Sequence, residues 1–135
     1  MPISQVVVER IRFITDSRGF LFEPIDPESI PGQHNVHVAW TNPGSVRGNH
    51  AHKVGTETVI VTGDALVRLK ENNKVTDYSV SYGEAWRFTI PPGVVHAFKC
   101  TGPKPMLLVT FNTEPHQRTT QDLTPEVLIA VDEAW

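Results

Sequence analysis

The chain has 135 residues, of which 39% are hydrophobic and 20% are charged, and its formal net charge is -3. This length supports one domain with its own core, and the single cysteine, Cys100, excludes a fold held by internal disulfides and favours a reducing compartment. The mild charge, without a block of lysine and arginine, excludes nucleic acid and anionic lipid as electrostatic partners. Apolar runs too short for a membrane span, and an N-terminus unlike a signal peptide, lead us to expect a cytoplasmic protein.

Short segments rich in β-branched and aromatic residues follow one another along the chain, separated by many of its eleven prolines and nine glycines. The segments that we expect as strands are 6–9, 11–14, 20–23, 35–41, 57–61, 65–70, 75–80, 85–90 and 106–112. Segment 65–70 is predicted as the hairpin partner of 57–61, and 71–74 as a hairpin tip. Many short strands between Gly/Pro turns predict a single all-β domain over 1–135, a sandwich or small barrel with a core at about 11–115.

The alternating segment 35–41 has two faces. Val36, Val38 and Trp40 lie on one face, and His37 lies on the opposite face. We interpret the large aromatic side chains as core residues rather than as platforms for sugar stacking. These are Trp40, Trp86, Phe88 and Phe98. If the face that carries His37 lines the inside of a barrel, His37 is a candidate substrate-binding residue.

The C-terminal region differs from the rest of the chain. A polar stretch begins at Glu114, and we expect it to be loosely held, with His116 as a surface residue. Thr124 is predicted to cap a short helix over 127–134, with Pro125 at the first helical position.

Two histidines and a carboxylate lie close together near the middle of the chain. His50 and His52 are two residues apart, so on a strand both imidazoles point to the same face. Glu57 opens the next apolar run, and a third histidine, His96, follows a Pro-Pro-Gly turn. Three imidazoles and one carboxylate suit a divalent metal ion such as Zn, Ni, Fe(II) or Mn. The sequence therefore predicts a metal site on these four residues.

The same residues resemble the two motifs of the cupins, the superfamily of double-stranded β-helix (jelly-roll) proteins. The first motif starts at Gly44 and continues through His50, His52 and Glu57 to Gly63. The second motif is carried by Gly83, Pro91, Gly93 and His96. Small departures in spacing, and Cys100 where asparagine is frequent, remove none of the four ligands. The resemblance implies a cupin jelly roll with a short C-terminal helix or tail.

A narrower resemblance points to the RmlC-like cupins that act on nucleotide sugars. Segment 16–23 looks like the substrate-binding strand of dTDP-4-dehydrorhamnose 3,5-epimerase, whose Arg and Glu, here Arg18 and Glu23, reach into the neighbouring subunit. Segment 47–53 is similar to the active-site segment of the dTDP-sugar 3,4-ketoisomerases. Segment 41–50 most closely resembles the C-terminal cupin domain of bifunctional capsular-polysaccharide enzymes, which bind zinc and epimerise a 4-keto nucleotide sugar at C3. These resemblances imply a homodimer that exchanges N-terminal strands, and zinc as the metal.

The expected function is epimerisation or isomerisation of a 4-keto nucleotide (dTDP or UDP) sugar for surface polysaccharide synthesis. Both reactions remove a proton beside a carbonyl, which suits an imidazole, and both form an enediolate that requires nearby positive charge. The candidate catalytic residues are His50, His52, Lys53 and Tyr82, the last as a proton donor. The candidate substrate-binding residues are Arg18, Glu23, Arg47 and His37.

The identity of the base depends on the metal. A histidine that binds metal through its lone pair is a poor base, so His50 suits that role if the metal is absent or uses only some of the four groups. Without metal, His50 and His52 form an acid/base pair; with all four groups bound, the base is another residue or a metal-bound hydroxide. Glu57 favours metal, because the metal-free ketoisomerases do not generally carry a carboxylate there. Two alternatives stay open: a cupin dioxygenase on a small molecule, and a non-catalytic sugar-binding cupin.

Overall fold

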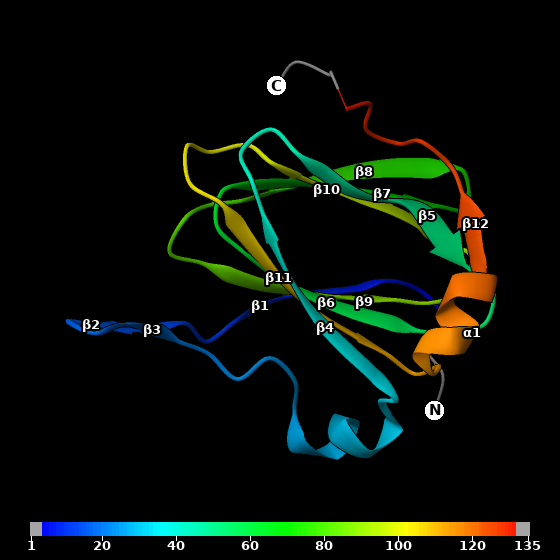
Figure 1. Ribbon diagram of the computed structural model, residues 1–135, viewed down its shortest axis with the longest axis horizontal. Coiled ribbons are helices and arrows are strands. Elements are labelled where there is room, and N and C mark those ends of the chain that lie inside the picture. The colour runs from blue at the N-terminus through cyan, green and yellow to red at the C-terminus, as the bar shows by residue number, and fades with distance from the viewer. Residues whose placement is uncertain (1–3, 132–135) are drawn as a thin grey trace.

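Two five-stranded antiparallel sheets face each other in the computed structural model, which describes residues 4–131 (Figure 1). The first sheet has the order β1 (Val7–Ile11), β9 (Ala85–Ile90), β6 (Glu57–Thr62), β11 (Met106–Asn112) and β4 (Asn35–Thr41). The second sheet has the order β12 (Leu123–Pro125), β5 (Val46–His52), β10 (Val95–Cys100), β7 (Ala65–Glu71) and β8 (Lys74–Val80). The remaining elements are the hairpin of β2 (Ile14–Asp16) and β3 (Gly19–Leu21), a 3-10 helix η1 (Pro27–Gly32) and α1 (His116–Gln121). This arrangement is the predicted cupin jelly roll.

The pairing of β6 differs from the prediction. β6 pairs with β9 and β11, whereas β7 lies in the other sheet between β10 and β8, so the two strands are not hairpin partners. The short turn after Thr62 carries the chain from one sheet to the other, as at the corners of a sandwich. Gly63 has a φ of 109°, and a Cβ there would lie 3.1 Å from the Met106 Cα atom. The predicted tip at 71–74 is confirmed, since Asn72 and Asn73 have positive φ angles in the tight turn between β7 and β8.

Apolar side chains from both sheets fill the space between them. Phe88 and Phe98 are buried in this core and Trp86 packs against it, so three of the four aromatic predictions are confirmed. The prediction for Trp40 is wrong, because its side chain is 64% exposed. Val36 and Val38 lie on the same outer face of β4, and only the opposite face of this edge strand points between the sheets. The predicted alternation along β4 is confirmed, but the face formed by Val36, Val38 and Trp40 points outward.

The predicted C-terminal helix is also wrong over the described residues. Thr124 and Pro125 belong to β12, which pairs with β5, and Ile129 is fully buried against Leu66 and Ala97. Backbone pairing of Leu123–Pro125 with β5 and burial of Ile129 hold this segment against the second sheet in a non-helical form. Residues 132–134 of the predicted helix lie outside the described part of the chain. The helix that does form, α1, lies in the stretch expected to be loosely held.

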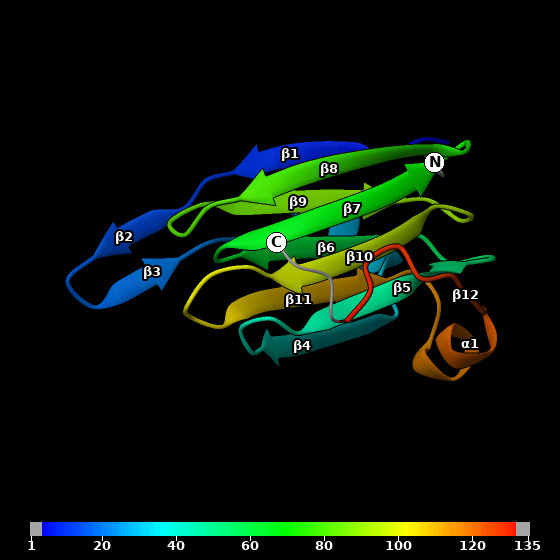
Figure 2. The same ribbon diagram turned by 90° about the horizontal axis from the view of Figure 1, so that it is seen from above.

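The β2–β3 hairpin extends away from both sheets, and we call it the arm (Figures 1 and 2). Phe13, Phe20 and Phe22 stack on one another with ring centroids 5.0–6.3 Å apart.

In residues 4–131 no helix is long and apolar enough to cross a membrane.

Candidate metal centre and pocket

β5 presents two of the predicted ligands on the inner face of the second sheet. His50 and His52 alternate with the outward residue between them, and His96 on β10 pairs directly with His50 across the strands. The two strands approach closely at Gly48, where a Cβ would lie 2.6 Å from the His96 carbonyl oxygen and φ is 90°. The His50 ring centroid lies 4.7 Å from that of His96 and 5.3 Å from that of His52. Strand pairing therefore collects the three imidazoles.

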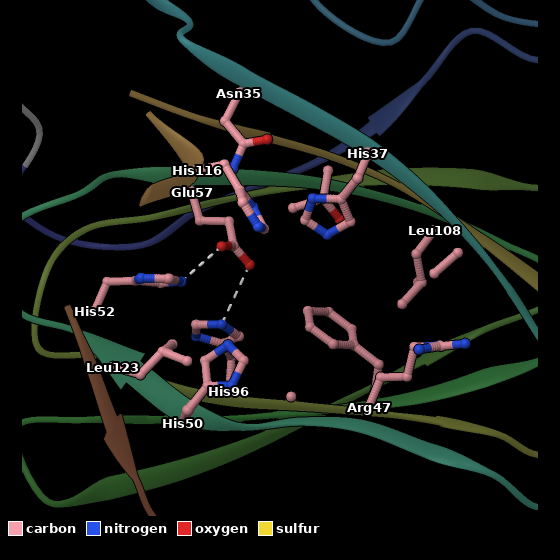
Figure 3. A pocket seen from close by; sticks show the side chains of 14 residues that line it. Asn35, His37, Arg47, His50, His52, Glu57, His96, Leu108, His116 and Leu123 are labelled. Atoms are coloured by element: carbon pink, nitrogen blue, oxygen red, sulfur yellow. Dashed lines mark ion pairs between the residues drawn. The ribbon is translucent and has the colours of Figure 1, made fainter. Parts of the chain in front are cut away.

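The first sheet supplies the carboxylate. Glu57, at the start of β6, points toward the histidines, with Oε2 2.7 Å from His52 Nε2 and Oε1 3.3 Å from His96 Nε2 (Figure 3). One ligand atom from each of His50, His52, Glu57 and His96 lies within 4.8 Å of all the others. The structure therefore brings all four predicted ligands together.

The nitrogen atoms fit a metal ion. His96 Nδ1 lies 3.0 Å from the Val94 carbonyl oxygen, an acceptor that places the proton on Nδ1 and the lone pair on Nε2. Nε2 of His52 and of His96 is buried and, among the described residues, lacks a hydrogen-bond partner of good geometry despite the nearby Glu57. Buried polar atoms without partners are rare, and a bound cation would satisfy both.

Burial and neighbouring charges shift the pKa values of these groups. Burial, with help from the nearby His96, lowers the pKa of His50 to about 4. Burial also opposes the charged form of His52, but Glu57 and Asp122 outweigh it and raise the pKa of His52 above its usual value. Burial would raise the pKa of Glu57, yet its close contacts with the His52 and His96 rings hold it well below its usual range. At neutral pH His50 is thus neutral and Glu57 is ionised, as metal binding requires.

The cluster lies at the base of a pocket of about 360 Å³ between the two sheets. The residues lining this pocket are Asn35, His37, Ala39, Arg47, Gly48, His50, His52, Glu57, His96, Phe98, Leu108, Thr110, His116 and Leu123. Figure 3 shows His37 and Arg47 across the pocket from His52, and the Arg47 Nε atom donates a hydrogen bond of 2.8 Å to Thr41 Oγ1. The pocket thus combines one end that carries the four candidate metal ligands with a side lined by polar and cationic groups.

Four of the predicted site residues lie outside this pocket. Lys53 is exposed just beyond β5, and Tyr82 is 65% exposed on the turn between β8 and β9, with Lys104 over its ring. Arg18 lies at the tip of the arm, where it bonds Asp16 rather than Glu23.

Glu23 follows the arm and lines two other surface hollows. The structure therefore does not bring Lys53, Tyr82, Arg18 or Glu23 to the pocket of their own chain.

Sequence reasoning missed several residues of the site. His116 and Asn35 line the pocket, Asn112 contacts Glu57, and Asp122 contacts His52. Asn112 ends a strand that was predicted, so its polar side chain after an apolar run was a usable signal. Asp122 and His116 carried no local signal, because only the return of the chain to β5 places them at the site.

The fold and the four-residue cluster define a cupin with one candidate metal centre. The chain belongs to the polysaccharide biosynthesis C-terminal domain family, whose pattern matches residues 14–124. It is 27% identical over 121 residues to the spore coat polysaccharide biosynthesis protein SpsL of Bacillus subtilis, an alignment that covers 82% of this chain and 80% of that protein.

Two solved structures show the same fold. The sugar 3,4-ketoisomerase QdtA of Thermoanaerobacterium thermosaccharolyticum superposes with a TM-score of 0.69 at 21% identity, covering 89% of this chain and 87% of QdtA. The 3'-monoepimerase ChmJ of Streptomyces bikiniensis, in complex with dTDP-quinovose, gives 0.75 at 16% identity, covering 99% of this chain and 77% of ChmJ.

Proposed function

We propose that this protein is a metal-binding epimerase or ketoisomerase of a 4-keto nucleotide sugar in surface polysaccharide synthesis. The observation that carries the proposal is the cluster of His50, His52, Glu57 and His96 at the base of a pocket about 360 Å³ in volume. The family description supports the pathway, and the printed activities of QdtA and ChmJ support the class of reaction. The predicted cytoplasmic location belongs to the same proposal.

Zinc is the metal that we propose, because imidazole and carboxylate ligands in a compact cluster suit it. His52, Glu57 and His96 would hold the ion, which leaves His50 beside it with its lone pair free. When bound, the ion supplies positive charge that stabilises negative charge developing on a substrate oxygen.

His50 is the residue to which we assign proton transfer at the carbon beside the carbonyl. It is only half-buried, it faces the pocket, and its lowered pKa keeps the imidazole neutral at neutral pH. Arg47, held by Thr41, offers a guanidinium for an oxyanion or a phosphate of the substrate. His37 faces the same pocket and offers a hydrogen bond to a sugar hydroxyl.

The test is solvent exchange. Purified protein is incubated in D2O with dTDP- and UDP-linked 4-keto sugars, and the products are analysed by NMR. Deuterium at C3 with inversion identifies an epimerase, and a moved carbonyl identifies a ketoisomerase. His50→Asn is expected to reduce exchange by about 100-fold or more, whereas His34→Asn, whose ring binds the Thr113 carbonyl outside the pocket, leaves it unchanged. Ligand binding without exchange for every such sugar would contradict the proposal and favour a non-catalytic cupin.

We further propose that the protein forms a homodimer in which the arm reaches the partner chain. Two exposed apolar surfaces support this: Phe20 and Leu21 on the arm, and the outer stripe of Val36, Val38 and Trp40 on edge strand β4. Light scattering after size exclusion is expected to give twice the chain mass. A Trp40→Asp variant is expected to shift toward monomer, while Val75→Asp, equally apolar and exposed on β8, is not.

A further inference from the structure

After β11, the last long strand, the chain returns to the cluster of His50, His52, Glu57 and His96. β12 pairs with β5 in a register that places Leu123 opposite His52 and Pro125 opposite His50 (Figure 2). The segment from Glu114 to Val131, which we call the C-terminal segment, therefore runs along the strand that carries two of the four ligands. Its position bears on where those ligands point.

Asp122 makes the most direct connection. Its Oδ1 atom accepts hydrogen bonds from the backbone N–H groups of Lys53 and Val54 at 2.9 and 2.8 Å, and Oδ2 accepts one from Gly55 at 3.0 Å. Oδ2 also lies 3.4 Å from Nδ1 of His52, an ion-pair distance without hydrogen-bond geometry, and this buried Nδ1 has no other partner among the described residues. Asp122 is 6% exposed, so this carboxylate is built into the site rather than solvated. It fixes the loop that follows β5 and faces the far side of the His52 ring, opposite Nε2.

Asn112 makes a second connection, at the start of the C-terminal segment. Its Nδ2 atom donates to Oε2 of Glu57 at 3.3 Å, and its Oδ1 atom accepts from the Glu114 N–H at 2.8 Å. The side chain packs against Gly55, where a Cβ would collide with the Asn112 amide. The same loop is thus held by Asp122 on one side and by Asn112 on the other.

Asn49 holds the far end of the segment. Its Oδ1 atom accepts from the N–H groups of Leu128 and Ile129 at 2.9 and 3.1 Å, and its Nδ2 atom donates to the Ile129 carbonyl at 3.0 Å. Asn49 immediately precedes His50 and has a φ of 59°. Displacing the segment would free the residues on both sides of the pair His50 and His52.

We propose that Asp122 is a positioning residue for His52, and that docking of the C-terminal segment on β5 is thermodynamically coupled to metal binding. A carboxylate behind a metal-binding imidazole orients the ring and strengthens it as a ligand. His96 provides the internal contrast, since the Val94 carbonyl of its own turn holds it. The inference deepens the proposed function and rests on metal binding by the cluster.

The first test measures zinc affinity by chelator competition in wild type and in two variants. Asp122→Asn keeps an acceptor for Lys53 and Val54 but replaces Oδ2 with an NH2 group that cannot accept from Gly55 and carries no negative charge toward His52. Glu126→Gln is the matched control, because it breaks the 2.6 Å ion pair with Lys70 in the same segment without touching the site. Asp122→Asn is expected to weaken zinc binding by about 10- to 100-fold, and Glu126→Gln by less than about twofold.

The second test needs no variant and measures amide hydrogen exchange with and without zinc. Coupling is reciprocal, so zinc is expected to slow exchange at residues 53–55 and 123–129, in wild type and in Glu126→Gln. In Asp122→Asn this protection is expected to be lost. If Asp122→Asn does not fold, Asn49→Gly replaces it, since glycine accepts the positive φ, and a several-fold loss of zinc affinity is expected.

The outcomes separate the inference from the proposed function. The coupling is overturned if wild type binds zinc but Asp122→Asn binds it equally tightly, or if zinc does not change amide exchange at residues 53–55 and 123–129. The proposed metal centre is unaffected by either result. Wild type that binds no zinc or other divalent ion overturns both. A loss of affinity specific to Asp122→Asn, together with zinc-dependent protection, supports the inference.

Discussion

The metal cluster and the arm hold their predicted site residues in opposite ways. His52, Glu57 and His96 are buried, come from both sheets and meet within one chain. Arg18 lies on a hairpin that extends from the sheets, and its side chain is 88% exposed. The four candidate ligands therefore meet within one chain, whereas the arm would act, as proposed above, by reaching a second chain.

The largest effect is expected at the cluster. Glu57→Gln keeps the volume but removes the negative charge, so metal content should fall from about one ion per chain to near zero, and exchange activity by at least about 100-fold. Elemental analysis after dialysis measures the first, and NMR measures the second. Glu84→Gln, which removes a half-buried carboxylate paired with Arg10 outside the pocket, serves as control. A variant that loses metal but retains activity would return the mechanism to a metal-free pair of His50 and His52.

The arm should show a loss of activity without a loss of metal. Arg18→Ala is expected to lower kcat/KM by about 10- to 100-fold at full metal content, because a substrate-positioning cation is gone. Arg12→Ala, also exposed near the base of the arm, is the control.

Mixing the arm and cluster variants tests which chain the arm serves. Arg18→Ala chains and Glu57→Gln chains, unfolded and refolded together, should show more activity than either variant alone. Each mixed dimer has one site with both an intact cluster and an intact arm. No recovery in mixed dimers would show that the arm serves its own chain or none.

Metal retention should depend on pH through His52. Its pKa is raised in the metal-free protein because Glu57 and Asp122 outweigh its burial, and metal requires the neutral ring. Affinity is therefore at its full value above this raised pKa and falls by about tenfold per pH unit below it. Metal affinity is measured by chelator competition at roughly even pH steps between pH 5 and pH 9, a range that spans the ordinary histidine pKa. An affinity that does not change over the range would show that His52 is not a ligand.

The smallest effect is expected outside both regions. Tyr82→Phe should change exchange activity by less than about twofold, because the hydroxyl is exposed on the β8–β9 turn away from the pocket and the ring still packs with Lys104. Tyr78→Phe, in the neighbouring strand, provides a comparison for general effects on folding. A large loss with Tyr82→Phe would place this turn at the site of a partner chain, as proposed for the arm.

Local sequence indicated the four candidate ligands because the patterns that mark them are local, although strand pairing and the second sheet bring them together. Two histidines separated by one residue share a face on any strand, and proline and glycine predict the turn before His96. Local sequence misplaced Trp40, because alternation defines two faces without saying which one points inward. It also took β6 and β7 for a hairpin, because a short turn looks the same whether the chain pairs with itself or crosses between sheets.

The sequence by itself determined the strand content, since side-chain alternation depends on neighbouring residues. Its motifs, through their resemblance to the cupins, indicated the jelly-roll class and the four candidate ligands. Only the tertiary structure decided that Asn112 and Asp122 stand behind Glu57 and His52, and that Lys53 and Tyr82 stay outside the pocket. The physical reason is that these contacts depend on how distant strands pair. The docking of β12 on β5 is fixed by backbone hydrogen bonds and by burial of Ile129. No pattern in the neighbouring sequence predicts these contacts.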